Sequence, residues 1–119
     1  MPVDELAPHE MAFAELVWAS APIASGELVK LADRQLGWKK STVYTVLRKL
    51  CERGLFANQG SVVSVVTTKD DYVAGRSRQF VEDNFGGSLP RFVATFIGGK
   101  KPSDDQIAEL RSLIDRYEE

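Results

Sequence analysis

The stretch Gly37–Phe56, GWKKSTVYTVLRKLCERGLF, decides how the rest of the chain is interpreted. Its apolar residues recur at the i, i+3, i+4 and i+7 spacing of one face of an α-helix. These residues are Val43, Val46, Leu47 and Leu50. Hydroxyls and a guanidinium lie together on the other face, near the start of the helix. They belong to Ser41, Thr42, Tyr44, Thr45 and Arg48. One face is therefore expected to pack on a core, and the polar face needs another explanation.

Composition limits the classes of protein that the chain can belong to. It has 119 residues, of which 44% are hydrophobic and 27% are charged, as in an ordinary globular protein with one core and at most a small appendage. No apolar run approaches the roughly 20 residues of a membrane span. The first ten residues, MPVDELAPHE, are acidic and interrupted by proline, unlike a secretion signal. We therefore expect a cytoplasmic protein with no membrane contact.

Cysteine and histidine are too few for most site chemistry. Cys51 and His9 are the single residues of their types, so the sequence predicts no internal disulfide, no metal site and no cofactor. Cys51 borders the apolar stripe and is expected to pack as a helix cysteine, with a Cys51/His9 nucleophile pair as the alternative. His9 is expected at the surface in a first helical turn. The paired glycines of FGGSLP and IGGKKPSD lack phosphate-loop spacing, so we predict no enzyme activity.

Local charge differs from the overall charge. The net charge is −2, but six basic residues accompany one acid, Glu52, between Arg34 and Arg53. Affinity for phosphate depends on where cations gather, not on the sum over the chain. A solvated helix face is the alternative interpretation of these cations.

The order of the expected elements indicates the fold. A helix from about Pro8 to Ala19, a second after Ser25 as N-cap that ends at Gly37, and the opening stretch closed by Gly54 give three helices. The short GWKK connection is typical of a helix-turn-helix unit. Residues 55–68 then switch to a strand pattern with a turn at Gln59-Gly60-Ser61, which predicts a β-hairpin. We predict a mainly α protein with a winged helix-turn-helix domain at residues 1–68, whose polar third-helix face would contact base edges and phosphates.

Residues 69–119 are expected to form a helical dimerisation region. Thr68 with Asp71 resembles a capped start of a long helix that ends at the Gly86-Gly87 pair, and Ser103 with Gln106 resembles a capping box. Three helices here carry more apolar surface than one short segment can bury. The residues expected to contact a second copy are Tyr72, Phe80, Phe85, Leu89, Phe92, Val93, Phe96, Ile107, Leu110 and Ile114. Twofold association would match a pseudo-palindromic site on DNA, whereas packing against the first domain in a monomer is the alternative.

Four segments together resemble a known family. They are EMAFAELVW, PIASGELV, the opening stretch, and FVEDNFGGSLPRFVATF. The chain is similar along nearly its whole length to the penicillinase and methicillin-resistance repressors of the BlaI/MecI/CopY type. This resemblance implies a homodimeric transcriptional repressor that binds double-stranded DNA at an operator. A winged-helix protein-protein interaction module without specific DNA binding is the alternative, supported by the net acidity and the uncharged wing.

The resemblance also implies individual contacts. The recognition contacts would fall on Ser41, Thr42, Tyr44 and Thr45, with Tyr44 where many relatives carry a basic residue. From their own positions, Lys39 and Lys40 before the helix and Arg48 and Lys49 further along it would contact phosphates, and Asn58, Gln59 and Ser61 in the wing could donate uncharged hydrogen bonds to phosphate. Because the wing has no cation before Lys69, we expect weaker or more dimer-dependent binding than in a relative with a basic wing. Trp38 is expected to pack in the core.

The resemblance finally concerns regulation. Family members are often inactivated by cleavage of an Asn-Phe bond in the dimerisation region. By alignment on FGGSL this bond falls at Thr95-Phe96, which makes it the candidate proteolytic site and a regulatory protease a candidate partner. Threonine in place of the family's asparagine is a departure that counts against cleavage here. Copper sensing is not expected, because the cysteine cluster of the copper-responsive branch is missing.

Overall fold

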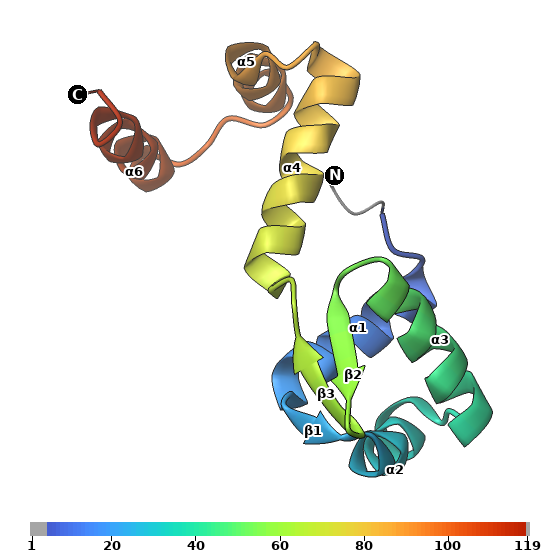
Figure 1. Cartoon of the computed structure of the whole chain (residues 1–119). Helices are drawn as coiled ribbons and strands as arrows, with labels where there is room; N and C mark the ends of the chain where they lie inside the picture. Colours follow the sequence, from blue (N-terminus) through green and yellow to red (C-terminus); the bar gives the residue numbers. More distant parts are fainter. Residues whose placement is uncertain (1–4, 119) are drawn as a thin grey trace. The chain divides into compact units, whose positions relative to one another are not determined.

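The computed structural model describes residues 5–118, which form two compact units that divide between Gln79 and Phe80 (Figure 1). The first unit contains helices α1 (Pro8–Ser20), α2 (Ser25–Leu36) and α3 (Lys40–Glu52) and strands β1 (Ile23–Ala24), β2 (Phe56–Gln59) and β3 (Val62–Val65). Helix α4 (Lys69–Phe85) runs from the first unit into the second, which also contains α5 (Leu89–Gly99) and α6 (Asp104–Asp115). Within residues 5–118, no helix is both long and apolar enough to span a membrane.

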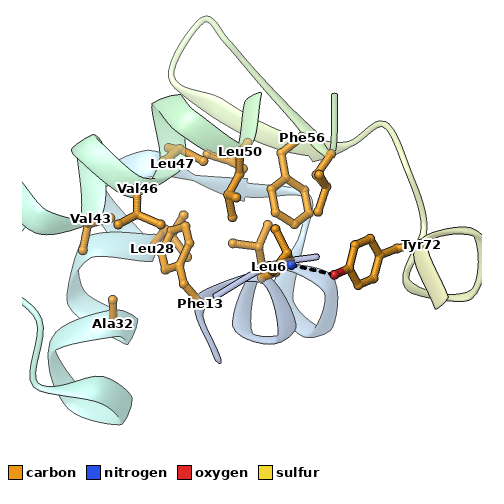
Figure 2. Packing of buried hydrophobic residues seen from close by; sticks show 14 residues of the cluster. Leu6, Phe13, Leu28, Ala32, Val43, Val46, Leu47, Leu50, Phe56 and Tyr72 are labelled. Carbon is orange, nitrogen blue, oxygen red and sulfur yellow. Dashed lines mark hydrogen bonds between the residues drawn. The ribbon is translucent and has the colours of Figure 1, made fainter. Parts of the chain in front are cut away.

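The first unit is built on the apolar stripe of α3. Val43, Val46, Leu47 and Leu50 are all buried, as predicted, against α1, α2 and the sheet (Figure 2). The largest fully shielded side chains around them are Phe13, Phe56, Leu28 and Leu55. Trp38 stacks on Phe13 with ring centroids 5.3 Å apart, which confirms its packing role. The core therefore fixes which face of α3 remains outside.

The connection between α2 and α3 is tight because of one glycine. Gly37 ends α2 with φ of +69°, a left-handed conformation that glycine adopts without steric cost.

The start of α2 differs from the prediction. Ser25 is not the N-cap: Ala24 precedes the helix, and Ser25 is its first residue, with its side chain buried. The sequence signal for a cap was wrong because a buried serine and a capping serine look alike in sequence.

The predicted hairpin is present, and a third strand joins it. Strands β2 and β3 pair antiparallel, and Gly60 and Ser61 form the turn with φ of +58° and +61°, as tight hairpin turns require. Gln59 is the last residue of β2, so the turn is shorter than predicted. Strand β1, which was not predicted, pairs with β3 through Ile23 and Ala24. The sheet order is β1-β3-β2, and β3 is its centre.

The helix starts in the second half are largely those predicted. The Thr68 hydroxyl accepts a hydrogen bond from the Asp71 amide over 3.1 Å, and the Ser103 hydroxyl accepts one from the Gln106 amide over 3.2 Å. Helix α5 begins after a cap that the sequence analysis did not identify, Ser88. Helix α4 ends at Gly86 and Gly87, both with positive φ, as expected. Three capped helices thus follow the winged helix.

Tyr72 lies elsewhere than the sequence suggested. It was expected on the dimerisation face, but its side chain is 7% exposed and belongs to the core of the first unit. Its hydroxyl accepts a hydrogen bond from the Leu6 amide over 2.9 Å (Figure 2). The first compact unit therefore continues beyond residue 68, where the sequence analysis set the domain boundary, because the first turn of α4 completes its core.

Candidate nucleic-acid interface

Helix α3 presents a polar face because its other face is the core. All but one of the residues predicted to bind DNA from this helix and its N-terminal flank are exposed to solvent. These exposed residues are Lys39, Lys40, Ser41, Thr42, Thr45, Arg48 and Lys49. Hydroxyls follow the two lysines at the helix start, and Arg48 and Lys49 come later along α3. The fold thus brings these predicted contacts onto one helix.

The cations of this face are not neutralised by the protein. Within residues 5–118, neither Lys39, Lys40, Arg48 nor Lys49 forms an ion pair. Several other cations of the first unit are paired with glutamates. These pairs are Lys30–Glu27, Arg53–Glu10, Lys69–Glu15 and Arg76–Glu5. The four cations Lys39, Lys40, Arg48 and Lys49 thus form one local group of positive charge on α3 and its N-terminal flank, in a chain whose net charge is negative.

Arg53 has a different role from the neighbouring cations. Its guanidinium lies 3.4 Å from a carboxylate oxygen of Glu10, and both side chains are largely covered. Glu10 also accepts a hydrogen bond from the Ala7 amide at the start of α1. Arg53 thus joins the end of α3 to the start of α1 and contributes to the fold.

The N-terminus of α3 is left open to an anion. Its first turn has no acidic residue, and the Lys39 side chain does not cap it. The other helices described in residues 5–118 each have a hydroxyl cap, an acidic residue in the first turn, or both. The first amides of a helix have no partner within it, and they favour negative charge through the helix dipole. A phosphate group is a suitable ligand for this helix start.

Tyr44 differs from its neighbours on α3. It is half-buried, and its hydroxyl donates a hydrogen bond to the Ser25 hydroxyl on α2 over 3.2 Å. The sequence analysis placed this hydroxyl among the DNA contacts. In the structure it is directed into the fold, because Tyr44 lies next to Val43 at the edge of the buried stripe.

Cys51 is a packed cysteine, as predicted. It is half-buried against the core and lines a small pocket of about 290 Å³ with Tyr44, Leu47, Arg48 and Asn58. Burial, and secondarily the charge of Glu52, raises the pKa of the Cys51 thiol above its ordinary value of 9.0. The thiol is therefore protonated at neutral pH and is a poor nucleophile. His9 is exposed on α1, next to the ring of Trp38, and no metal-binding cluster occurs in residues 5–118.

The wing offers uncharged donors. Asn58, Gln59 and Ser61 are exposed at its tip, and residues 56–68 contain no lysine or arginine. The tip is held in place because the Ser25 amide donates a hydrogen bond to the Ser61 carbonyl over 2.8 Å. Gln59, the predicted wing contact, thus lies beside a fixed turn.

The second unit carries exposed apolar side chains. Phe80, Phe85, Phe92 and Phe96 follow one another with ring centroids 5.5–6.2 Å apart, yet Phe80 is 50% and Phe96 62% exposed. Helices α5 and α6 line a groove of about 720 Å³ with Phe92, Val93, Phe96, Ile97, Leu110 and Leu113. None of residues 80–118 is buried. The Thr95-Phe96 bond lies inside α5, so a protease could reach it only after local unwinding.

Comparison with known proteins adds an independent result. The sequence model of the family described as Penicillinase repressor matches residues 6–116. The chain belongs to the penicillinase repressor family. The Penicillinase repressor of Bacillus licheniformis is 22% identical over 97% of this chain and 93% of its own length. The Methicillin resistance regulatory protein MecI of Staphylococcus aureus is 20% identical over 94% of each chain.

Membership of the penicillinase repressor family confirms several predictions. The resemblance stated from the four sequence segments is correct, and the helices with a small antiparallel sheet are consistent with the predicted winged helix. The family consists of transcriptional repressors, and the two relatives carry the names of regulators instead of enzymes. The chain is therefore a transcriptional regulator of the repressor class and not an enzyme.

The sequence analysis did not identify Ser25, which is hydrogen-bonded to Tyr44 of α3 and to Ser61 of the wing. Its burial had no signal in the sequence.

Proposed function

We propose that this chain is a homodimeric, sequence-specific DNA-binding repressor that reads a pseudo-palindromic operator with α3. The observation that carries the proposal is the division of α3 into two faces. One face forms the core, and the other carries exposed hydroxyls and cations without ion pairs in residues 5–118. A helix of this kind matches the width of the major groove.

The residues of the interface divide by chemistry. Lys39, Lys40 and the open N-terminus of α3 would bind phosphates and set the register on the duplex. Ser41, Thr42 and Thr45 would meet base edges, where a hydroxyl can donate and accept and a threonine methyl can contact thymine. Arg48 and Lys49 would contact flanking phosphates, and Gln59 would reach the backbone from the wing. This division predicts that sequence preference resides in the hydroxyl residues and salt dependence in the cations.

Dimerisation is supported by what the second unit leaves exposed. Residues 80–118 include large apolar side chains on all three helical segments, and none of them is buried. A second copy would cover this surface with an identical one, as twofold dimers do. The contact residues proposed here are Phe80, Phe85, Leu89, Phe92, Val93, Phe96, Ile107, Leu110 and Ile114. Tyr72 is left out because it belongs to the first core. Two winged helices would then face two half-sites.

Regulation by a protease remains a prediction within this function. Cleavage at Thr95-Phe96 would divide α5 and separate Phe96 from Phe80, Phe85 and Phe92. The dimer contact would be lost and DNA affinity would fall with it. Incubation of the protein with lysate from induced cells, followed by mass spectrometry of the fragments, tests this step.

The function is tested by genomic binding. The tagged protein is immunoprecipitated with its DNA from the native cell, and the fragments are sequenced. The same experiment is performed on Thr42→Ala plus Thr45→Ala, and on the control Ser77→Ala, whose hydroxyl is exposed outside α3. An inverted repeat recovered with wild type and control but lost with the α3 variant supports the proposal. No enrichment by folded, abundant wild type contradicts it and favours the interaction module.

A further inference from the structure

One buried serine joins the two elements proposed to touch DNA. Ser25 is the first residue of α2, and its side chain is 6% exposed. Within residues 5–118 it is the one polar residue that is buried. Its hydroxyl accepts a hydrogen bond from the Tyr44 hydroxyl of α3 over 3.2 Å. Its amide donates to the Ser61 carbonyl in the wing turn over 2.8 Å. The start of α2 is thus bonded to both the recognition helix and the wing tip, which lie around it (Figure 1).

The position of Tyr44 makes this link relevant to recognition. Tyr44 lies three residues, nearly one turn, after Ser41 and directly before Thr45, and both of these residues would read bases. A half-buried side chain bonded to a neighbouring helix limits rotation of α3 about its own axis. Contacts to base edges require groups held within about 0.5 Å of the productive geometry. A small rotation of α3 would therefore lower operator affinity without changing the number of phosphates near the cations.

The wing tip is restrained through the same serine. Ser61 adopts a positive φ of 61°, which a serine keeps only when its surroundings determine the turn. Ala24, immediately before Ser25, also pairs with Val62 of β3. Movement of Ser25 would therefore displace the turn that presents Gln59.

We infer that Tyr44 and Ser25 are positioning residues, which fix α3 relative to the wing, and that the Tyr44 hydroxyl does not contact DNA. This inference rests on the proposed DNA-binding function and assigns a role that differs from a direct contact. Its consequence is specific. Removing either hydroxyl should have the same effect on operator binding, since the hydrogen bond is lost in both cases.

The test uses three variants of the full-length chain: Tyr44→Phe, Ser25→Ala and the double variant. The probes are a duplex that carries the inverted repeat recovered in the genomic experiment and a scrambled duplex of equal composition. Each single variant should weaken binding to the repeat by about three- to tenfold, the value of one hydrogen bond. The double variant should lose no more than either single one. Binding to the scrambled duplex and the salt slope should not change, because phosphate contacts are kept.

A matched control separates positioning from stability. Tyr72→Phe also removes a tyrosine hydroxyl bonded within the first unit, between Leu6 and α4. At a temperature where circular dichroism shows every variant folded, this control should retain the wild-type ratio of repeat to scrambled binding. A reduced ratio in the control would overturn the inference, because any loss of stability would then explain the result.

The remaining outcomes are distinct. If Tyr44→Phe weakens operator binding and Ser25→Ala does not, Tyr44 contacts DNA directly and the inference is wrong. If wild type itself does not prefer the repeat, the proposed function fails before any variant is compared.

Hydrogen exchange without DNA gives an independent measure: Tyr44→Phe should speed exchange of the Ser25 amide about three- to tenfold. Unchanged exchange of this amide would overturn the coupling between α3 and the wing.

Discussion

The Leu6 amide donates a hydrogen bond to the Tyr72 hydroxyl over 2.9 Å, although the two residues are 66 positions apart in sequence. This bond ties the segment before α1 to the first turn of α4. Ring contacts extend the junction, since Trp18 lies 5.8 Å from Tyr72 and 5.7 Å from Phe56 between ring centroids. The Trp18 indole also donates to the Thr67 carbonyl over 2.9 Å. The entry into α4 is therefore part of the winged-helix core.

Tyr72→Phe is expected to destabilise the first unit by about 1–3 kcal/mol, because the buried Leu6 amide loses its partner while the ring remains. Urea unfolding followed by circular dichroism measures this change in the free energy of unfolding. The slope of that free energy against urea concentration should be the same in both proteins. Tyr117→Phe is the control, since that side chain is 81% exposed and should leave stability unchanged. Equal stability of both variants and wild type would mean that the Leu6 bond contributes nothing.

Lys40→Gln is expected to flatten the salt dependence of DNA binding. Loss of one phosphate contact lowers the magnitude of the slope of log K against log salt by about 0.9. Lys40 has no ion pair within residues 5–118, so its charge is available to a ligand. The measurement is a titration of duplex DNA at several salt concentrations.

Lys69→Gln is the matched control for this titration. Lys69 has equal formal charge but lies 2.9 Å from a carboxylate oxygen of Glu15, away from α3. Its removal should leave the slope unchanged. An equal effect of both lysines would show that overall charge, not the α3 face, governs binding.

Local patterns were sufficient to predict most elements of this fold. The stripe of α3 and the caps at Thr68 and Ser103 depend on residues within a few positions of one another, and all three are present. Strand β1 was missed because it has two residues and exists through pairing with Val62 and Val63, far along the chain. Tyr72 was misplaced for the same reason, since its partner Leu6 is remote in sequence.

The candidate site was predicted less completely than the fold. The exposure of Lys40, Thr42 and Thr45 follows from helical periodicity, because the buried stripe determines the opposite face. Tyr44 lies at the border of the two faces, where periodicity does not tell whether a tyrosine points outward or inward. The Ser25 hydroxyl, supplied by another helix, decides this in the structure.

The thiol of Cys51 gives a prediction about pH. Its pKa is raised above 9.0 by burial and by Glu52, so the folded chain holds this proton more tightly than the unfolded chain does. The resulting stabilisation is present below pH 9.0 and is lost as pH rises through the pKa of the folded state. Relative to Cys51→Ala, wild type should therefore lose stability as the pH rises above 9.0. Urea unfolding of both proteins at each pH measures this difference, and a constant difference would contradict it.

Phe96→Asp is expected to dissociate the proposed dimer. Phe96 is 62% exposed at the groove between α5 and α6, and a charge there would have to be buried against the second copy. An interface anchor contributes about 2 kcal/mol or more, so the dimer Kd should rise by roughly 30-fold or more. Sedimentation equilibrium measures this constant. In wild type, the melting temperature should rise with protein concentration, and this dependence should weaken in the variant.

Ala94→Asp is the control for this charge, because helical periodicity places Ala94 on the side of α5 opposite Phe92 and Phe96. It should retain the wild-type Kd for dimerisation. If wild type sediments as a monomer at all concentrations, the second unit is not covered by another copy and the twofold operator loses its physical basis. If both variants dissociate equally, the contact involves the whole circumference of α5 instead of its apolar face.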